Sequence, residues 1–319
     1  MKKQLLTLSS LLVLGVSLTS CGGASSSSVA SSGSNFDTSK KIQVYTRDTT
    51  SGTRDGFFTK IGFSDAISDN SKLASGYVEV ASNGDMMTSV KQDEYAIGYI
   101  SLATLSSSGL TGLTYEGVKP TEENVLNETY KLTRNFNYVT RATFANDTVK
   151  NIVEAFTAFL TTKDAKTTIQ GKDGIVEIKD SDPTWDSIKD NYAVTKLDNS
   201  SVTVKFGGST SVEKIAKALT SEFSAKCGNF KAEHNHTGSG DAFKRTQGSE
   251  KDSSDYLDIG FLSRELKSSE AAAAGTSSKI CTDAIVAVVN SKNTYTTTTA
   301  ADLKSIFDGT CTTWSQIIK

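Results

Sequence analysis

Apolar positions along the chain alternate between two spacings, and this alternation predicts the fold class. Strand-like apolar runs lie at 41–47, 75–81, 95–101, 201–208, 258–263 and 283–290. Helical spacing begins after Thr53 and recurs at 148–162, 211–223 and 300–309. Because strands and helices take turns, we expect an α/β fold. The polar stretch 179–201 interrupts the pattern and is interpreted as a linker rather than a core element.

The beginning of the chain does not follow this pattern. Lys2 and Lys3 precede the apolar run 5–16, which is too short to span a bilayer, and this layout is typical of a signal peptide. The run leads into Leu-Thr-Ser-Cys, which resembles the bacterial lipobox. Residues 1–20 are therefore expected to be a lipoprotein signal peptide, and Cys21 to carry the acyl chains, palmitate among them. The alternative is an ordinary secreted protein with an incidental cysteine.

Residues 21–40 are rich in glycine and serine and have almost nothing to bury. They are predicted to form a flexible tether that reaches about 25 Å r.m.s.. The protein is therefore expected to hang from the cell membrane by its lipid, on the extracytoplasmic side.

The composition of the remaining chain excludes several classes of protein. The whole chain has 37% hydrophobic and 22% charged residues, as expected of a globular protein. Without the signal peptide it has 32 Lys and Arg (34 less two) against 36 Asp and Glu, which argues against nucleic acid as a partner. Cys227, Cys281 and Cys311 show no Cys-x-x-Cys spacing, so we expect no metal. One disulfide with a free thiol, or three small core residues, both remain open.

Two predicted helix starts are rich in hydrogen-bond donors. In the first, Ser51, Gly52 and Thr53 open a helix, and Arg47 offers a bidentate fork to a tetrahedral oxyanion. Gly52 lets the backbone approach closely. A helix N-terminus has free amides and a positive dipole end, so that it can receive an anion.

The second start follows the Gly-Gly turn at the end of the strand 201–208. Ser209, Thr210 and Ser211 supply hydroxyl groups, and Thr210-x-x-Glu213 has the form of a capping box. Each start alone also fits an ordinary N-cap. Micromolar affinity needs about 8 kcal/mol net, each charge-assisted bond contributes roughly 1.5 to 3 kcal/mol, and association costs at least about 4 kcal/mol. One helix end cannot easily meet that demand, so we expect both to hold one oxyanion between two lobes.

Other chemistry is sparse. His234 and His236 alternate along a strand-like segment and point the same way, so a metal pair or two solvent-facing or pocket-rim histidines are the alternatives. Ser51 as a nucleophile would need a histidine and an acid to orient it. We expect neither a cofactor nor an enzyme.

Several motifs together resemble the phosphate-binding lipoproteins of ABC importers, which have the type II periplasmic-binding-protein fold. The motifs are SGTRD after a strand ending in arginine, GGSTSVEKIAKAL, TGSGDAFK, DIGFLSREL, DAIVAVVN and LKSIFDGTCTTWSQI. They cover most of 41–178 and 202–319. The resemblance implies a monomer with a ligand cleft between two lobes, which captures inorganic phosphate and delivers it to ABC permease and ATPase subunits. It places Arg47, Ser51, Gly52 and Thr53 on one lobe against Thr210, Ser211, Ser239 and Ser263 on the other.

The order of these motifs differs from that of the family. The GSTS segment opens the family's chain and a helical segment similar to 130–160 closes it, whereas here SGTRD comes first. The chain therefore resembles a circular permutant, a change tolerated where the broken loop is exposed. The implied lobes are 41–134 with 290–319, and 135–289, with the old ends bridged by 179–201.

One position departs from the family's pattern. The best-known members have an aspartate that accepts the proton of hydrogen phosphate where this chain has Ser263. Asp48, Asp241 or Glu265 would have to supply the acceptor, so binding of sulfate or molybdate is an alternative. A surface lipoprotein acting as a sensor or adhesin, and a phosphoester hydrolase, are further alternatives.

Overall fold

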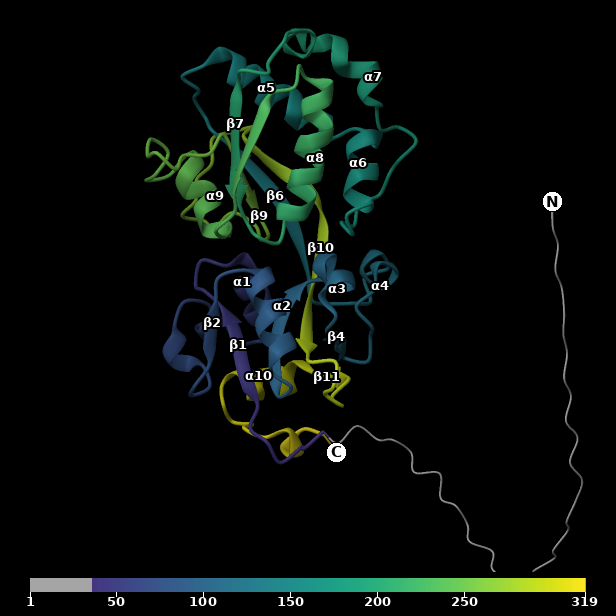
Figure 1. The fold of residues 1–319 in the computed structure, drawn as a ribbon, viewed down its shortest axis with the longest axis vertical. Coiled ribbons are helices and arrows are strands. Elements are labelled where there is room, and N and C mark those ends of the chain that lie inside the picture. Colours follow the sequence, from purple (N-terminus) through teal and green to yellow (C-terminus); the bar gives the residue numbers. More distant parts are fainter. Residues whose placement is uncertain (1–35, 319) are drawn as a thin grey trace, which may run out of the picture. The chain divides into compact units, whose positions relative to one another are not determined.

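A computed structural model describes residues 36–318 (Figure 1). Most of its strands join one mixed sheet in the order β2-β1-β3-β10-β6-β9-β7-β8, and β4 also pairs with β10. A small second sheet pairs β11 with β5. The strands are β1 (Gln43–Arg47), β2 (Val78–Val80), β3 (Ala96–Ser101), β4 (Thr111–Gly112), β5 (Thr114–Tyr115), β6 (Thr133–Thr140), β7 (Thr203–Gly208), β8 (Lys231–Asn235), β9 (Ile259–Leu262), β10 (Ser277–Val289) and β11 (Thr297–Thr298).

Helices cover this sheet, as predicted for an α/β fold. They are α1 (Gly52–Lys60), α2 (Asn83–Gln92), α3 (Leu102–Ser108), α4 (Glu122–Leu126), α5 (Asp147–Phe159), α6 (Lys163–Gln170), α7 (Trp185–Ile188), α8 (Glu213–Lys226), α9 (Ser239–Thr246) and α10 (Ala300–Phe307). The strands at 41–47, 75–81, 95–101, 201–208 and 258–263 and the helices at 148–162, 211–223 and 300–309 are confirmed within a few residues.

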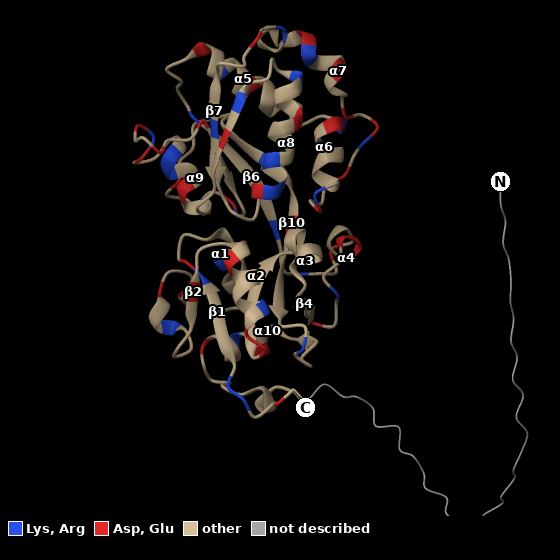
Figure 2. Cartoon of the chain, viewed as in Figure 1, with Lys and Arg blue, Asp and Glu red and all other residues tan. Residues whose placement is uncertain are grey.

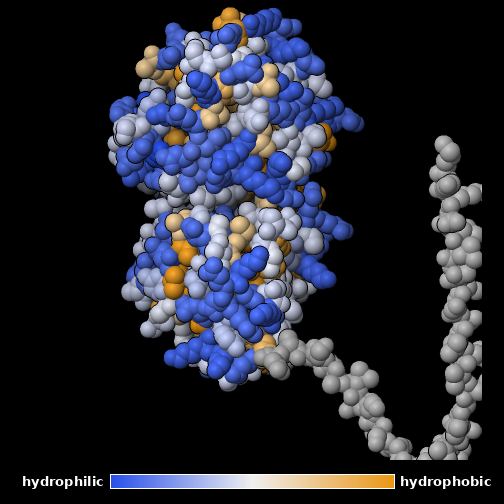
Figure 3. Space-filling model, in the orientation of Figure 1, coloured by the Kyte–Doolittle hydropathy of each residue, from blue (hydrophilic) through white to orange (hydrophobic). Residues whose placement is uncertain are grey.

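Two large apolar clusters divide the described residues into two lobes. The first lobe packs around Phe57, Tyr99, Phe307 and Trp314, below in Figure 1. The second lobe packs around a cluster of aromatic side chains from α5, α7, β7 and α8, namely Phe156, Phe159, Trp185, Phe206 and Phe223. Lys and Arg alternate with Asp and Glu over both lobes (Figure 2), and the visible surface is mainly hydrophilic (Figure 3). Burial of apolar surface within each lobe is thus the main stabilising contribution.

Strand β10 belongs to both lobes. Its first part, Ser277–Ala284, pairs antiparallel with β6, and its last part, Ile285–Val289, pairs antiparallel with β3. Ile285 and Val289 pack in the cluster of the first lobe. The crossing of β10 therefore lies near Ala284, before the lobe boundary predicted at 289, because the sheet hydrogen bonds change partner there. The other predicted lobe limits stay a prediction.

The structure corrects two expectations about segments outside the core. The tether was expected to run to residue 40, but Phe36 packs against Tyr95 and Trp314 with ring centroids 5.3 and 5.8 Å away. The stretch 179–201 is not a loose linker, because Trp185 and Val194 are buried in the second lobe. The signal peptide, Cys21 and tether residues 22–35 lie outside the described residues.

Two further expectations are resolved by local structure. The segment 130–160, expected to be helical, begins with β6, and α5 starts only at Asp147. Cys227, Cys281 and Cys311 are all buried and free, so the alternative of three small core residues is confirmed. Within 36–318 no helix is long and apolar enough to cross a membrane.

Candidate functional site

The first donor-rich loop joins β1 to α1. Ser51 caps α1, because its Oγ accepts from the amides of Thr53 and Arg54 at 3.2 and 3.4 Å. Arg54 is fully buried and donates to the carbonyls of Arg47 and Ala66, so that it fixes the path of the loop. The helix predicted after Thr53 is thereby confirmed, and it begins at Gly52.

The arginine that ends β1 is buried in the first lobe. Arg47 is 1% exposed, its Nε donates to the carbonyl of Val80 at 3.2 Å, and its Nη2 donates to that of Ala81 at 2.7 Å. Its Nη1 is buried and has no hydrogen-bond partner. A guanidinium carries five N–H donors and cannot readily lose its charge, so this free nitrogen favours a negatively charged acceptor.

The second donor-rich loop follows β7. Gly208 has a φ of +94°, which favours glycine, and turns the chain away from the strand. The predicted capping box of Thr210 and Glu213 does not form: α8 begins at Glu213, and its N-cap Val212 has no side-chain cap bond. Instead the Oγ of Ser209 accepts from the amide of Ser211 at 3.2 Å, which caps a preceding turn. Thr210 lies in this turn, half-buried.

The two loops meet between the lobes. Thr53 Oγ1 lies 2.9 Å from Ser211 Oγ, and the amide of Gly240 donates to the carbonyl of Thr50 at 3.0 Å. Ser211, Thr53 and Arg47 are all buried. The structure therefore brings two predicted site residues, Thr53 of the first loop and Ser211 of the second, into direct contact.

Ser239 and Ser263 close the site from the second lobe. Their Oγ atoms lie 3.1 Å apart, and the amide of Ser263 donates to Ser239 Oγ at 2.9 Å. A Cβ added at Gly52 would lie 2.7 Å from Ser263 Oγ and still nearer to Ser239 Oγ. No side chain fits at Gly52 in this arrangement, which gives a physical reason for glycine there.

Three residues that the sequence did not point out complete this region. The hydroxyl of Ser211 also accepts from Asn83 Nδ2 at 2.9 Å and from Arg134 Nη2 at 3.0 Å. Since a hydroxyl oxygen has two lone pairs, both are taken, and Ser211 must donate its own proton to Thr53. Arg134 in turn is held by Asp283. Burial raises the pKa of the Asp283 carboxyl above its usual value, and the positive charge of Arg134 reduces this rise.

The three acids considered as proton acceptors differ in their surroundings. Asp48 Oδ2 is buried without a hydrogen-bond partner, 3.7 Å from Arg47 Nη2. Asp241 accepts from the hydroxyl of Thr237, and Glu265 accepts from Asn135 Nδ2 at 2.9 Å. Asp48 is therefore the one of the three that combines a free carboxylate oxygen with closeness to Arg47.

The two histidines stack behind the second loop. His236 Nδ1 donates to the carbonyl of Ser209 at 3.0 Å, and His234 Nδ1 lies 3.1 Å from His236 Nε2. Both rings stack on phenylalanines of β7 and β9, and His234 also lines a surface pocket, as the pocket-rim alternative predicts. Their nitrogens bond to each other, to Thr220 and to Ser209, so neither orients Ser51. No group of three metal-ligating side chains occurs in the described part of the chain.

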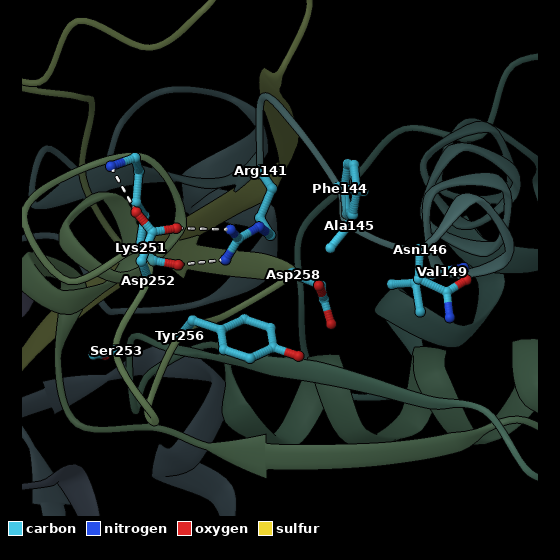
Figure 4. A pocket seen from close by; sticks show the side chains of 10 residues that line it. All are labelled: Arg141, Phe144, Ala145, Asn146, Val149, Lys251, Asp252, Ser253, Tyr256 and Asp258. Carbon is cyan, nitrogen blue, oxygen red and sulfur yellow. Dashed lines mark hydrogen bonds and ion pairs between the residues drawn. The ribbon is translucent and has the colours of Figure 1, made fainter.

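A separate pocket of about 310 Å³ opens on the second lobe (Figure 4). Its arginine, Arg141, donates to the carbonyl of Lys251 and pairs with Asp252 at 3.4 Å. The guanidinium therefore already has acceptors, and this pocket is a poorer anion site than the meeting point of the two loops.

Comparison with known proteins agrees with the motifs. Residues 193–318 match the PBP superfamily domain. Phosphate-binding protein PstS 2 of Streptococcus agalactiae serotype V is 28% identical over 319 residues, which covers 99% of this chain and 97% of that protein. Phosphate-binding protein PstS 2 of Streptococcus pneumoniae serotype 4 is 29% identical over 317 residues, 99% of each chain.

A solved structure is also similar. The crystal structure of a phosphate-binding protein of a phosphate ABC transporter from Streptococcus pneumoniae TIGR4 superposes with a TM-score of 0.62 and 26% identity. The superposition covers 87% of this chain and 99% of the chain in that crystal structure. The predicted resemblance and the two-lobed α/β fold are confirmed.

Proposed function

We propose that this protein, which resembles the phosphate-binding proteins of ABC importers, captures inorganic phosphate outside the cytoplasm and delivers it to an ABC permease and its ATPase. In this role it binds and releases phosphate without chemical turnover, needs no cofactor, and acts as a monomer. The similar proteins are themselves named as phosphate-binding proteins and as part of a phosphate transporter.

One observation carries this proposal: two donor-rich loops converge from opposite lobes beside a buried arginine. Thr53 Oγ1 and Ser211 Oγ lie 2.9 Å apart, and the Nη1 of Arg47 is buried without an acceptor. A tetrahedral oxyanion has several acceptor oxygens, so it can take hydrogen bonds from both lobes at once. Closure of the lobes around the ligand is the expected conformational step.

Most of the proposed site residues have a hydrogen-bond donor that is free to bind the anion. Ser51 Oγ accepts the cap amides, which leaves its proton for the anion, and the first amide of α1 at Gly52 has no intrahelical acceptor. The hydroxyls of Ser239 and Ser263 are hydrogen-bonded to each other, so one of their two protons is available for the anion. Thr53 Oγ1 accepts from Ser211 and so keeps its own proton, and Thr210 and the Nη1 of Arg47 supply further donors. Together these donors reach the number that micromolar affinity demands.

We assign the anchor to Cys21, with the acyl chains holding the protein at the outer face of the cell membrane. Cys21→Ser is expected to release the protein into the medium or periplasm, because two acyl chains are what stable anchoring needs. Fractionation of cells with an antibody to the protein measures this. Retention of the variant in the membrane fraction would contradict the lipobox.

We also propose that the chain order is permuted relative to family members in which the GSTS segment comes first, whereas the PstS 2 proteins, which align with 99% of this chain, share its order. The two ends of the described chain lie side by side, since Lys41 and Thr313 form an antiparallel bridge and the amide of Ile42 donates to the carbonyl of Thr312 at 2.9 Å. A short loop could join them, which is what a permuted origin requires.

Isothermal titration with phosphate, and then with sulfate as competitor, tests the proposed function. Wild type should bind phosphate, and Arg47→Ala should weaken binding by at least about 10-fold, because a charge-assisted bond to a buried guanidinium is lost. Tighter binding of sulfate or molybdate would point to another oxyanion. No binding of any of these anions would overturn the proposal and leave the sensor or adhesin alternative.

A further inference from the structure

Arg134 lies at the start of β6, where this strand leaves the first lobe. Its side chain is 4% exposed, and its Nε and Nη2 donate to Asp283 Oδ2 at 3.0 and 2.8 Å. The second proton of Nη2 goes to Ser211 Oγ at 3.0 Å. Asp283 is fully buried and also accepts from Ser101 Oγ at 2.8 Å. The carboxylate therefore fixes the edge of the guanidinium that carries Nε and Nη2, and Nη2 also contacts Ser211.

The free edge of Arg134 has unused donors. Its Nη1 is buried and has no hydrogen-bond partner, as is the case for Nη1 of Arg47. Three other arginines of the described chain, Arg54, Arg245 and Arg264, are buried as well, and none of them keeps a buried nitrogen without an acceptor. Buried polar groups normally have partners, so two orphaned guanidinium nitrogens in one region call for an explanation.

The two arginines are also close enough to repel each other. Burial lowers the pKa of Arg47, and the positive charge of Arg134 acts in the same direction. Asp283 pairs with Arg134, and Asp48 lies 3.7 Å from Arg47, so each arginine has one carboxylate beside it. What the two arginines offer to an anion is therefore their unused Nη1 groups. Arg134 also lines a cavity of about 450 Å³, together with Asp55 and Gly56 of α1 and with Arg264.

We infer that Arg134 is a second anion-binding arginine, and that Arg47 and Arg134 together hold a tetrahedral oxyanion at the meeting point of the two loops. This inference rests on the proposed function, and it names the residue that the resemblance did not supply. Asp283 is the positioning residue: it sets the orientation of the guanidinium and compensates its charge. The Nη1 groups of both arginines can donate charge-assisted hydrogen bonds to different oxygens of one tetrahedral anion.

The test uses a variant that removes the charge pair without leaving a buried charge. Arg134→Gln combined with Asp283→Asn replaces both ions by neutral amides. Either change alone would leave the remaining charge buried without its partner. The matched control, Lys166→Gln with Asp182→Asn, removes an ion pair of 2.6 Å on the second lobe. Isothermal titration of the whole protein with inorganic phosphate gives the dissociation constants, and thermal unfolding shows that each variant is folded.

The double variant at Arg134 should bind phosphate about 10- to 100-fold more weakly than wild type, the range expected for one charge-assisted hydrogen bond. The control should bind as wild type does. If wild type binds phosphate and the Arg134 double variant binds it equally well, this inference is overturned while the proposed function stands. If wild type does not bind phosphate, the proposed function fails first.

A second measurement decides the question if the double variant does not fold. In a crystal structure of the wild-type protein with phosphate, Nη1 of Arg134 should lie about 3 Å from a phosphate oxygen. A phosphate bound at Arg47 with Arg134 directed elsewhere would overturn the inference.

Discussion

Asp48 is the residue at which discrimination between phosphate and sulfate can be tested. Its Oδ1 accepts from the amide of Thr50 at 2.9 Å. Its Oδ2 is buried and has no hydrogen-bond partner, with Arg47 Nη2 3.7 Å away. A fixed carboxylate accepts the proton of hydrogen phosphate and repels sulfate, which has none. Asp48→Asn should therefore weaken phosphate binding and strengthen sulfate binding, each by about 10-fold, as measured by competition titration.

Asp241→Asn and Glu265→Gln are the matched controls for this prediction. The carboxylates of both already accept hydrogen bonds, from Thr237 and Asn135. Unchanged selectivity in Asp48→Asn, with a shift in one of the controls, would move the proton acceptor to that residue.

Single residues also show what the sequence could and could not predict at the site. The loop at Ser51 was recognisable, because a helix N-cap has a local signature. The loop at Ser211 was recognisable from its hydroxyl residues after Gly-Gly, although the predicted capping box does not form. Arg134 was not, because its environment depends on Asp283, 149 residues further along the chain. Asn83 was missed for the same reason: it reaches Ser211 from the start of α2, 128 residues away.

Among the secondary-structure elements, β8 and the turn that follows it carry a pH-dependent part of stability. Burial lowers the pKa of His234 from 6.5 to about 4, and it also lowers the pKa of His236. The folded state therefore favours neutral imidazoles, so its stability is complete above pH 6.5 and is lost as pH falls toward 4. From pH 7 to pH 5, protonation of His234 should lower the free energy of unfolding by at most about 2 kcal/mol, because solvent reaches part of this imidazole and weakens the effect.

Urea unfolding at both pH values measures this change. Comparison with the His234→Gln, His236→Gln double variant isolates the histidines, because the carboxylates contribute to both proteins alike. The double variant should lose less stability than wild type on acidification. An equal loss in the two proteins would show that the stacked imidazoles do not titrate in this range.

The elements that the sequence predicted well have clear apolar periodicity, and β6 does not. Its buried positions include Arg134, Asn137 and Thr140 beside Phe136 and Val139. Buried polar residues hide the alternation on which a strand prediction depends. The strand was missed because it carries a residue of the candidate site, where local rules are expected to fail.

For the whole molecule, the closeness of the two chain ends makes the proposed permutation testable. A chain in which a short loop joins residue 318 to residue 36, opened between Asp180 and Ser181, should fold and keep its phosphate affinity within about threefold. Both residues at the new opening are exposed, so few contacts are lost. Circular dichroism and isothermal titration measure the outcome, and a misfolded product would mean that the present order is needed for folding.

The position of β10 in the sheet has a consequence for biosynthesis. Each lobe needs this strand, which lies between β3 and β6, yet it is among the last parts of the chain to leave the ribosome. Neither lobe can complete its sheet before about nine-tenths of the protein has been made, since long-range strand pairing must wait for its partner. For the exported lipoprotein proposed above, this delay would keep both sheets incomplete until most of the chain has been made.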